Sequence, residues 1–99
     1  MARIDDLLRL MRQQDASDLH LTSGAAPYMR VHGEMVKQNY RSVTAETCQG
    51  LIFEILTENQ KEIFTDKFDL DFSYPLNGVG RFRVNVFMQR HGISACFRL

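Results

Sequence analysis

Apolar and polar residues alternate along residues 80–99, and this alternation restricts the folds available to the chain. A period of two residues is that of a half-buried β-strand, so residues 81–89 and 93–99 are predicted to form two strands joined by a tight turn. Phe87 and Cys96 interrupt the polar positions. The apolar positions are Phe82, Val84, Val86 and Met88 in the first strand, and Ile93, Ala95, Phe97 and Leu99 in the second. Such a hairpin has to bury one face against the rest of the chain.

A two-residue loop at His91 and Gly92 would fix the pairing of this hairpin. The resulting pairs on the apolar face are Val84 with Leu99, Val86 with Phe97, and Met88 with Ala95. On the opposite face, Arg98 would pair with Asn85 and lie diagonally from Arg83, within reach of its side chain. Arg81 would continue the same polar row.

The hairpin is locally basic in a chain that is neutral overall. It carries four arginines and one histidine without a carboxylate, whereas the whole chain has 12 Lys and Arg against 12 Asp and Glu. Grouped guanidinium groups are suited to phosphate, which they bind bidentately. Alternatively, this is a solvated strand face whose arginines pair with Asp69 and Asp71 on the preceding strand. Because cross-strand ion pairs and polar outer faces are common in antiparallel sheets, the hairpin pattern by itself favours the second interpretation.

The remaining patterns predict an α+β protein with a PAS-like antiparallel sheet and helices packed on one face. Residues 3–14 have the three- and four-residue apolar spacing of an amphipathic helix. A second helix is expected from the N-cap Thr44 to about Leu56, and a third from the capping box at Thr57 and Gln60 to near Thr65. Further strands are predicted at 17–22, 28–32, 34–38 and 68–74, with a loop at 75–80.

Length and composition indicate one soluble globular domain spanning residues 1–99. The balanced charge argues against a nucleic-acid partner. Acidic residues follow the N-terminus where a signal peptide would be apolar, and no run approaches the length of a membrane span, so a cytoplasmic location is expected. Cys48 and Cys96 lack metal or redox spacing and are predicted to be buried thiols.

No catalytic constellation is visible in the sequence. It contains no phosphate-binding loop with Lys-Ser/Thr and no zinc spacing. His20, His32 and His91 fall in three separate strand regions, and His32 and His91 each adjoin a turn glycine, so no metal site is expected. Asp18 and His20 share one strand face as a candidate acid/base pair, with Asp18 as an acceptor that organises the preceding turn as the alternative.

Four segments resemble the N-terminal domain of type IV pilus retraction ATPases, the PilT family of secretion ATPases. They are Ala-Ser-Asp-Leu-His-Leu at 16–21, the Pro27-x-x-Arg30-x-x-Gly33 spacing, Phe-Asp-Leu-Asp-Phe-Ser at 68–73, and Gly-Arg-Phe-Arg-Val-Asn-Val-Phe-x-Gln-Arg-x-Gly at 80–92. The resemblance implies a PAS-like domain followed by a RecA-like motor domain with Walker A, acidic and histidine boxes. It also implies a hexameric ring that drives twitching motility, with ATP bound between the two domains.

By this resemblance, Arg81, Arg83 and Arg98 are the residues expected to contact ATP phosphates, while the missing motor domain would hold Mg²⁺. Residues 1–99 would then be a fragment without ATPase activity of its own, and Leu99, which ends the chain inside a predicted strand, adds to that expectation. The implied partners are motor domains of the same and neighbouring subunits, and the pilus machinery at the inner membrane.

Two alternatives remain: a structural docking domain, and a small-ligand sensory module that would need an internal pocket. Against the pocket, five apolar side chains are expected to fill the core: Phe72, Phe82, Val84, Val86 and Phe97.

Overall fold

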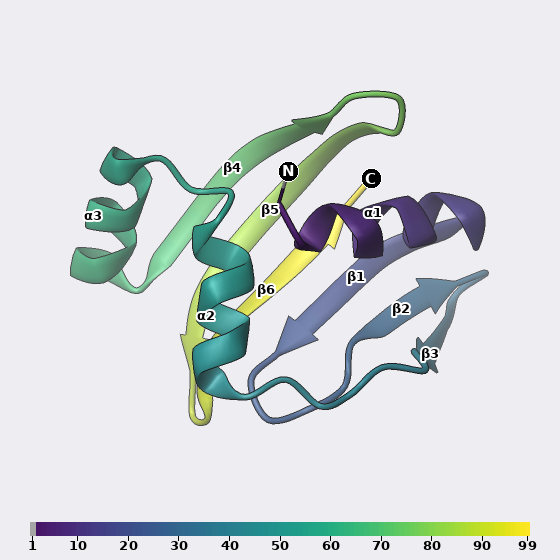
Figure 1. Cartoon of the computed structure of the whole chain (residues 1–99), viewed down its shortest axis with the longest axis horizontal. Helices are drawn as coiled ribbons and strands as arrows, with labels where there is room; N and C mark the ends of the chain where they lie inside the picture. The colour runs from purple at the N-terminus through teal and green to yellow at the C-terminus, as the bar shows by residue number, and fades with distance from the viewer. Residues whose placement is uncertain (1) are drawn as a thin grey trace.

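The computed structural model describes residues 2–99 as one six-stranded sheet and three helices (Figure 1). The helices are α1 (Ile4–Gln13), α2 (Ala45–Phe53) and α3 (Glu58–Lys67). The strands are β1 (Ala16–Thr22), β2 (Tyr28–Val31), β3 (Glu34–Lys37), β4 (Asp69–Leu76), β5 (Gly80–Gln89) and β6 (Gly92–Arg98). Neighbouring strands are all antiparallel, in the order β3-β2-β1-β6-β5-β4. The pairing of β1 with β6 therefore joins the two ends of the chain at the centre of the sheet.

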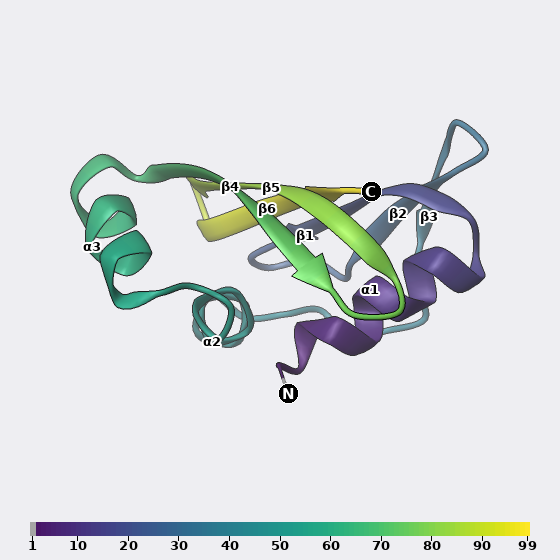
Figure 2. The same ribbon diagram turned by 90° about the horizontal axis from the view of Figure 1, so that it is seen from above.

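All three helices lie on one side of the sheet (Figure 2). The apolar stripe of α1 is buried there, with Ile4, Leu8 and Met11 fully enclosed. From the sheet, Phe82 and Phe97 are also fully enclosed within the same core. Burial of these side chains is the main force that holds the helices on the sheet. The predicted α+β class with helices on one face is confirmed, and the PAS-like assignment within it stays a prediction.

The caps of the second and third helices match the sequence signals, whereas their ends differ. Thr44 accepts a hydrogen bond from the Thr47 amide at 3.0 Å, and Thr57 and Gln60 form the reciprocal capping box. Helix α2 ends at Phe53, because the next turn tightens to hydrogen bonds between residues three apart. Helix α3 continues to Lys67 and stops where the backbone turns left-handed at the following residue.

Strand β4 is longer than predicted, because it includes Pro75 and Leu76. Pro75 lies opposite Arg81 in the ladder. A proline is tolerated here because β4 is at the edge of the sheet, where the missing amide hydrogen does not interrupt pairing with another strand. The expected six-residue loop is thus reduced to a short turn between Leu76 and Gly80.

The predicted hairpin register is wrong by two residues. Val84 pairs with Phe97 and Val86 with Ala95, and the ladder ends at Gln89 opposite Gly92. Gly92 is a strand residue with φ +130°, and a Cβ there would lie 2.9 Å from the Ser23 hydroxyl oxygen. The glycine therefore serves a close tertiary contact and not the predicted loop. Because the shift is even, every side chain keeps its predicted face.

Within residues 2–99, no helix combines the length and the apolar character that crossing a bilayer requires.

Candidate arginine site on the open face of the sheet

The sheet face opposite the helices carries no covering element from residues 2–99 (Figure 2), and we call it the open face. Its side chains come from alternate positions of each strand, so polar residues form rows that run across the strands. One row across the five strands from β2 to β4 consists of Arg30, Asp18, Arg98, Arg83 and Ser73. The row holds three arginines and one aspartate, and Arg98 and Arg83 are neighbours in it.

The three predicted site arginines lie together on the open face. Because of the corrected register, Arg83 is directly opposite Arg98 and not diagonal to it. Arg81 is two residues before Arg83 on β5, on the same face. All three line one open depression of about 600 Å³, together with Asp71, Phe72, Ser73 and Leu99. The structure therefore brings Arg81, Arg83 and Arg98 together on one face, as the sequence predicted, and that face is concave at this point.

Two of these arginines contact carboxylates of the same chain. Arg83 donates to both oxygens of Asp71, at 3.0 Å from Nη2 and 3.4 Å from Nε. This contact lowers the pKa of the Asp71 carboxyl and raises the pKa of the Arg83 guanidinium. Arg98 Nη2 lies 3.5 Å from Asp18 Oδ2. The predicted pairing of Arg83 with Asp71 is confirmed, whereas Asp69 instead accepts from the Asn85 amide at 3.1 Å.

These ion pairs leave the guanidinium groups accessible. The side chains of Arg83 and Arg98 are 77% and 68% exposed. The Arg83–Asp71 pair is exposed on both sides and therefore weak, so the Arg83 guanidinium group can exchange its carboxylate for a stronger anion. Arg81 has no ion pair among the described residues. Three guanidinium groups thus face two carboxylates, which leaves the depression with a positive charge.

The side chains expected to fill the interior are buried. Phe82, Val84, Val86 and Phe97 have no exposed surface, and Phe72 is half-buried against them. Packed side chains therefore fill the helix-covered side of the sheet. A sensory module would need a ligand cavity in this place.

The three histidines are spread over the sheet. His32 lies between β2 and β3 and His91 between β5 and β6, whereas His20 lies on β1. Among the described residues, the one group of potential metal ligands is instead Asp18, His20 and Cys96. Asp18 and His20 do approach each other, with 3.9 Å between Oδ2 and Nε2. No sequence signal pointed to Cys96, because it reaches them through the pairing of β1 with β6, which are distant in the chain.

The prediction that both cysteines are buried holds for Cys48 alone. Cys48 has no exposed surface and donates from Sγ to the Ile93 carbonyl at 3.3 Å, and burial raises the pKa of its thiol. Cys96 is half-buried, because its position on β6 points to the open face. The pKa of the Cys96 thiol is also raised, mainly because the thiol is partly buried and secondly because Asp18 is negatively charged. The positive charges of Arg98 and Arg30 oppose this shift.

Comparison with known proteins gives a consistent set of relatives, although no family model matches the chain. The type IV pilus retraction ATPase PilT of Pseudomonas aeruginosa is 39% identical over 95 residues, which cover 96% of this chain and 28% of PilT. The type IV pilus ATPase PilU of the same organism is 31% identical over 94 residues, covering 95% of this chain and 25% of PilU. A twitching motility protein of Neisseria gonorrhoeae is 34% identical over 98 residues, covering 93% of this chain and 25% of that protein. The chain thus spans about a quarter of the relatives it matches.

Solved structures agree with the sequence matches. The crystal structure of the pilus retraction motor PilT with bound ADP superimposes with a TM-score of 0.89 at 31% identity, covering all of this chain and 29% of that one. The ATPase DotB of Legionella pneumophila has the same fold, with a TM-score of 0.81 at 23% identity over 96% of this chain and 27% of DotB. Over nearly its whole length, the chain corresponds to the N-terminal domain of the PilT family of pilus retraction ATPases.

Proposed function

We propose that this chain is the N-terminal domain of a pilus retraction ATPase, and that Arg81, Arg83 and Arg98 contact the phosphates of ATP in the full-length protein. The observation that carries the proposal is the meeting of all three arginines in one open depression on an uncovered sheet face. A bound ADP in the related motor PilT is in keeping with it. Bidentate guanidinium contacts are suited to the oxygens of a polyphosphate.

In this proposal, the chain completes a nucleotide site that another domain forms. A RecA-like motor domain would supply the Walker A loop and hold Mg²⁺, so residues 1–99 alone would not hydrolyse ATP. Six full-length chains would form a ring in which each N-terminal domain packs on motor domains of its own and a neighbouring subunit. The assembly would act in the cytoplasm, against the pilus machinery at the inner membrane.

The exposed ion pairs suggest how the arginines would reach the nucleotide. When the domains close, Arg83 would exchange Asp71 for a phosphate oxygen, and Arg98 would do the same with Asp18. Each exchange replaces a carboxylate, exposed in Asp71 and buried in Asp18, by a more highly charged anion in a site that closure shields from water, where such contacts are stronger. The arginines would then stabilise charge on the transferring phosphoryl group. The packed sheet would move as a rigid body that couples nucleotide state to the ring.

A docking role for the same surface is the second candidate. The three arginines of the open face, with Arg83 already bound to Asp71, are also suited to acidic side chains of a neighbouring subunit. A sensory role is less well supported, because the aromatic and aliphatic side chains of the sheet fill the core.

The test is the ATPase rate of the full-length protein with Arg83→Ala, measured together with the mass of the assembly in solution. We expect the rate to fall by at least about tenfold with the ring intact, because an arginine that stabilises phosphoryl transfer contributes this much or more. Arg41→Ala is the matched control, since Arg41 is exposed and lies outside the depression. An unchanged rate would refute phosphate contact by Arg83, and loss of the ring together with the rate would favour docking.

A further inference from the structure

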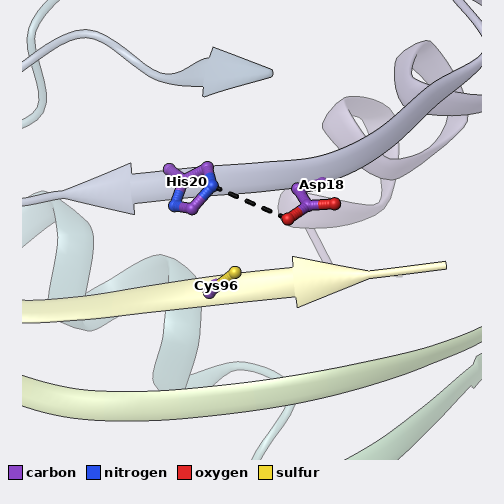
Figure 3. Close-up of side chains that lie close together, drawn as sticks. All are labelled: Asp18, His20 and Cys96. Atoms are coloured by element: carbon purple, nitrogen blue, oxygen red, sulfur yellow. Dashed lines mark ion pairs between the residues drawn. The ribbon is translucent and has the colours of Figure 1, made fainter. Parts of the chain in front are cut away.

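The cluster of Asp18, His20 and Cys96 has the composition of a metal site, and the proposed function makes no use of it as a unit. Figure 3 shows Asp18 and His20 on β1, and Cys96 on the neighbouring strand β6. His20 and Cys96 are direct partners in the β1–β6 ladder, and Asp18 is two residues from His20 on the same face. One potential ligand atom from each residue lies within 4.8 Å of the other two. The cluster is thus fixed on the two central strands of the sheet.

The spacing of the donor atoms is close to that of a tetrahedral zinc site. Zinc bonds of about 2.0–2.3 Å at tetrahedral angles place neighbouring donor atoms about 3.3–3.8 Å apart. Asp18 Oδ2 and His20 Nε2 are already 3.9 Å apart, and no pair exceeds 4.8 Å. The remaining gap is about 1 Å, and the backbone of β1 and β6 already holds the three residues next to one another.

A second observation points to a ligand at the same place. His20 Nε2 is buried, and it has no hydrogen-bond partner among residues 2–99. A buried polar atom without a partner is unfavourable, and such atoms in native proteins commonly mark a missing ion or water. This nitrogen is also the atom that lies toward Asp18 (Figure 3). A metal ion between the three side chains would give it a partner.

We propose that Asp18, His20 and Cys96 bind one divalent transition metal ion, with Zn²⁺ as the favoured ion. Thiolate, imidazole and carboxylate are all zinc ligands, whereas Mg²⁺ and Ca²⁺ prefer oxygen alone. With three protein ligands on an uncovered face, the fourth position is open to water or to a group from a partner. This site does not depend on the proposed role of the arginines in ATP binding.

The charges around the cluster set the conditions for metal binding. Arg98 contacts the same Asp18 oxygen that would bind the metal, and Arg30 is the partner of Asp18 on β2. Both positive charges oppose a cation, and Arg98 also competes for its ligand. Metal binding should therefore weaken the contact between Arg98 and Asp18. Removing the Arg98 guanidinium should strengthen metal binding by at least about twofold, because the Asp18 carboxylate of this pair is buried.

The experiment is a titration of the 99-residue chain with Co²⁺, followed by its displacement with Zn²⁺. Thiolate coordination gives a charge-transfer absorption in the near ultraviolet, which reports Cys96 directly. We expect this band to saturate at one metal per chain, and Zn²⁺ to abolish it. Cys96→Ser should remove the band, and both Cys96→Ser and His20→Gln should weaken Zn²⁺ binding by at least about tenfold in calorimetry.

The controls separate this cluster from other thiols and histidines. Cys48→Ala and His32→Gln should retain the band, because neither residue belongs to the cluster. Circular dichroism of each variant would establish that it is folded before metal is added. Co²⁺ binding without a thiolate band, or equal Zn²⁺ affinity in the original chain and in folded Cys96→Ser or His20→Gln, would overturn the proposal. Binding that is lost in Cys48→Ala but retained in Cys96→Ser would also overturn it.

Discussion

The hydrogen bond between Tyr74 and Asp5 joins the N-terminal helix to the edge strand β4. Tyr74 donates its hydroxyl to Asp5 Oδ1 at 2.7 Å, and Asp5 is 3% exposed although it is a carboxylate. Tyr74→Phe deletes the donor while it keeps the ring. A hydrogen bond to a charged group contributes about 1.5–3 kcal/mol, and its loss leaves a buried carboxylate with one partner fewer. We expect the free energy of unfolding to fall by that amount, and the Tm by about 6–24 °C.

The same contact predicts how stability depends on pH. Burial, with added effects of the Asp5 hydrogen bond and charge, raises the pKa of Tyr74 from 10.0 to about 12, against a smaller opposing effect of Arg9. The folded state therefore holds the tyrosine proton more tightly than the unfolded state does. The resulting stability is fully present below about pH 10 and is lost as the pH rises towards 12. Because Tyr74 is only half-buried, solvent screening reduces this loss to about 1–2 kcal/mol.

Urea unfolding at neutral pH and between pH 9 and about 12 would measure both effects. Tyr40→Phe is the matched control, because Tyr40 is 51% exposed and should change stability by less than about 0.5 kcal/mol. The loss above pH 10 should be smaller in Tyr74→Phe than in the original chain. If Tyr74→Phe were as stable as Tyr40→Phe at neutral pH, the inferred strength of the Tyr74–Asp5 contact would be refuted.

Two further substitutions test local features of the fold by the same urea unfolding. Thr57→Ala removes the N-cap of α3 and should cost about 1 kcal/mol, whereas a change below the measurement error would mean that the capping box contributes nothing. Gly92→Ala would place a methyl group 2.9 Å from the Ser23 hydroxyl oxygen and 3.0 Å from the Ala45 Cβ, and should cost about 1–3 kcal/mol. Gly33→Ala is its control, because Gly33 also has a positive φ but has no atom within 4 Å of the added Cβ; equal losses would rule out the clash.

Most of the fold followed from local patterns, and the errors occurred where distant residues decide. The alternation in residues 81–89 and the spacing in residues 3–14 predicted elements that the structure contains. The hairpin register was missed because Gly92 resembles a turn residue, whereas its close contacts with Ser23 and Ala45 place it in a strand. Pro75 was assigned to a loop because the sequence does not reveal that β4 is an edge strand.

The sequence by itself determined the faces of each strand, and so it placed Arg81, Arg83 and Arg98 on one polar surface. Side chains alternate with a fixed period, so this assignment survived a register error of two residues. Only the tertiary structure decided which strands are neighbours, because strand pairing depends on the burial of the whole core and not on local spacing. The pairing of β1 with β6 brought Asp18 to Arg98 and His20 to Cys96. The candidate metal site therefore exists only in the folded sheet.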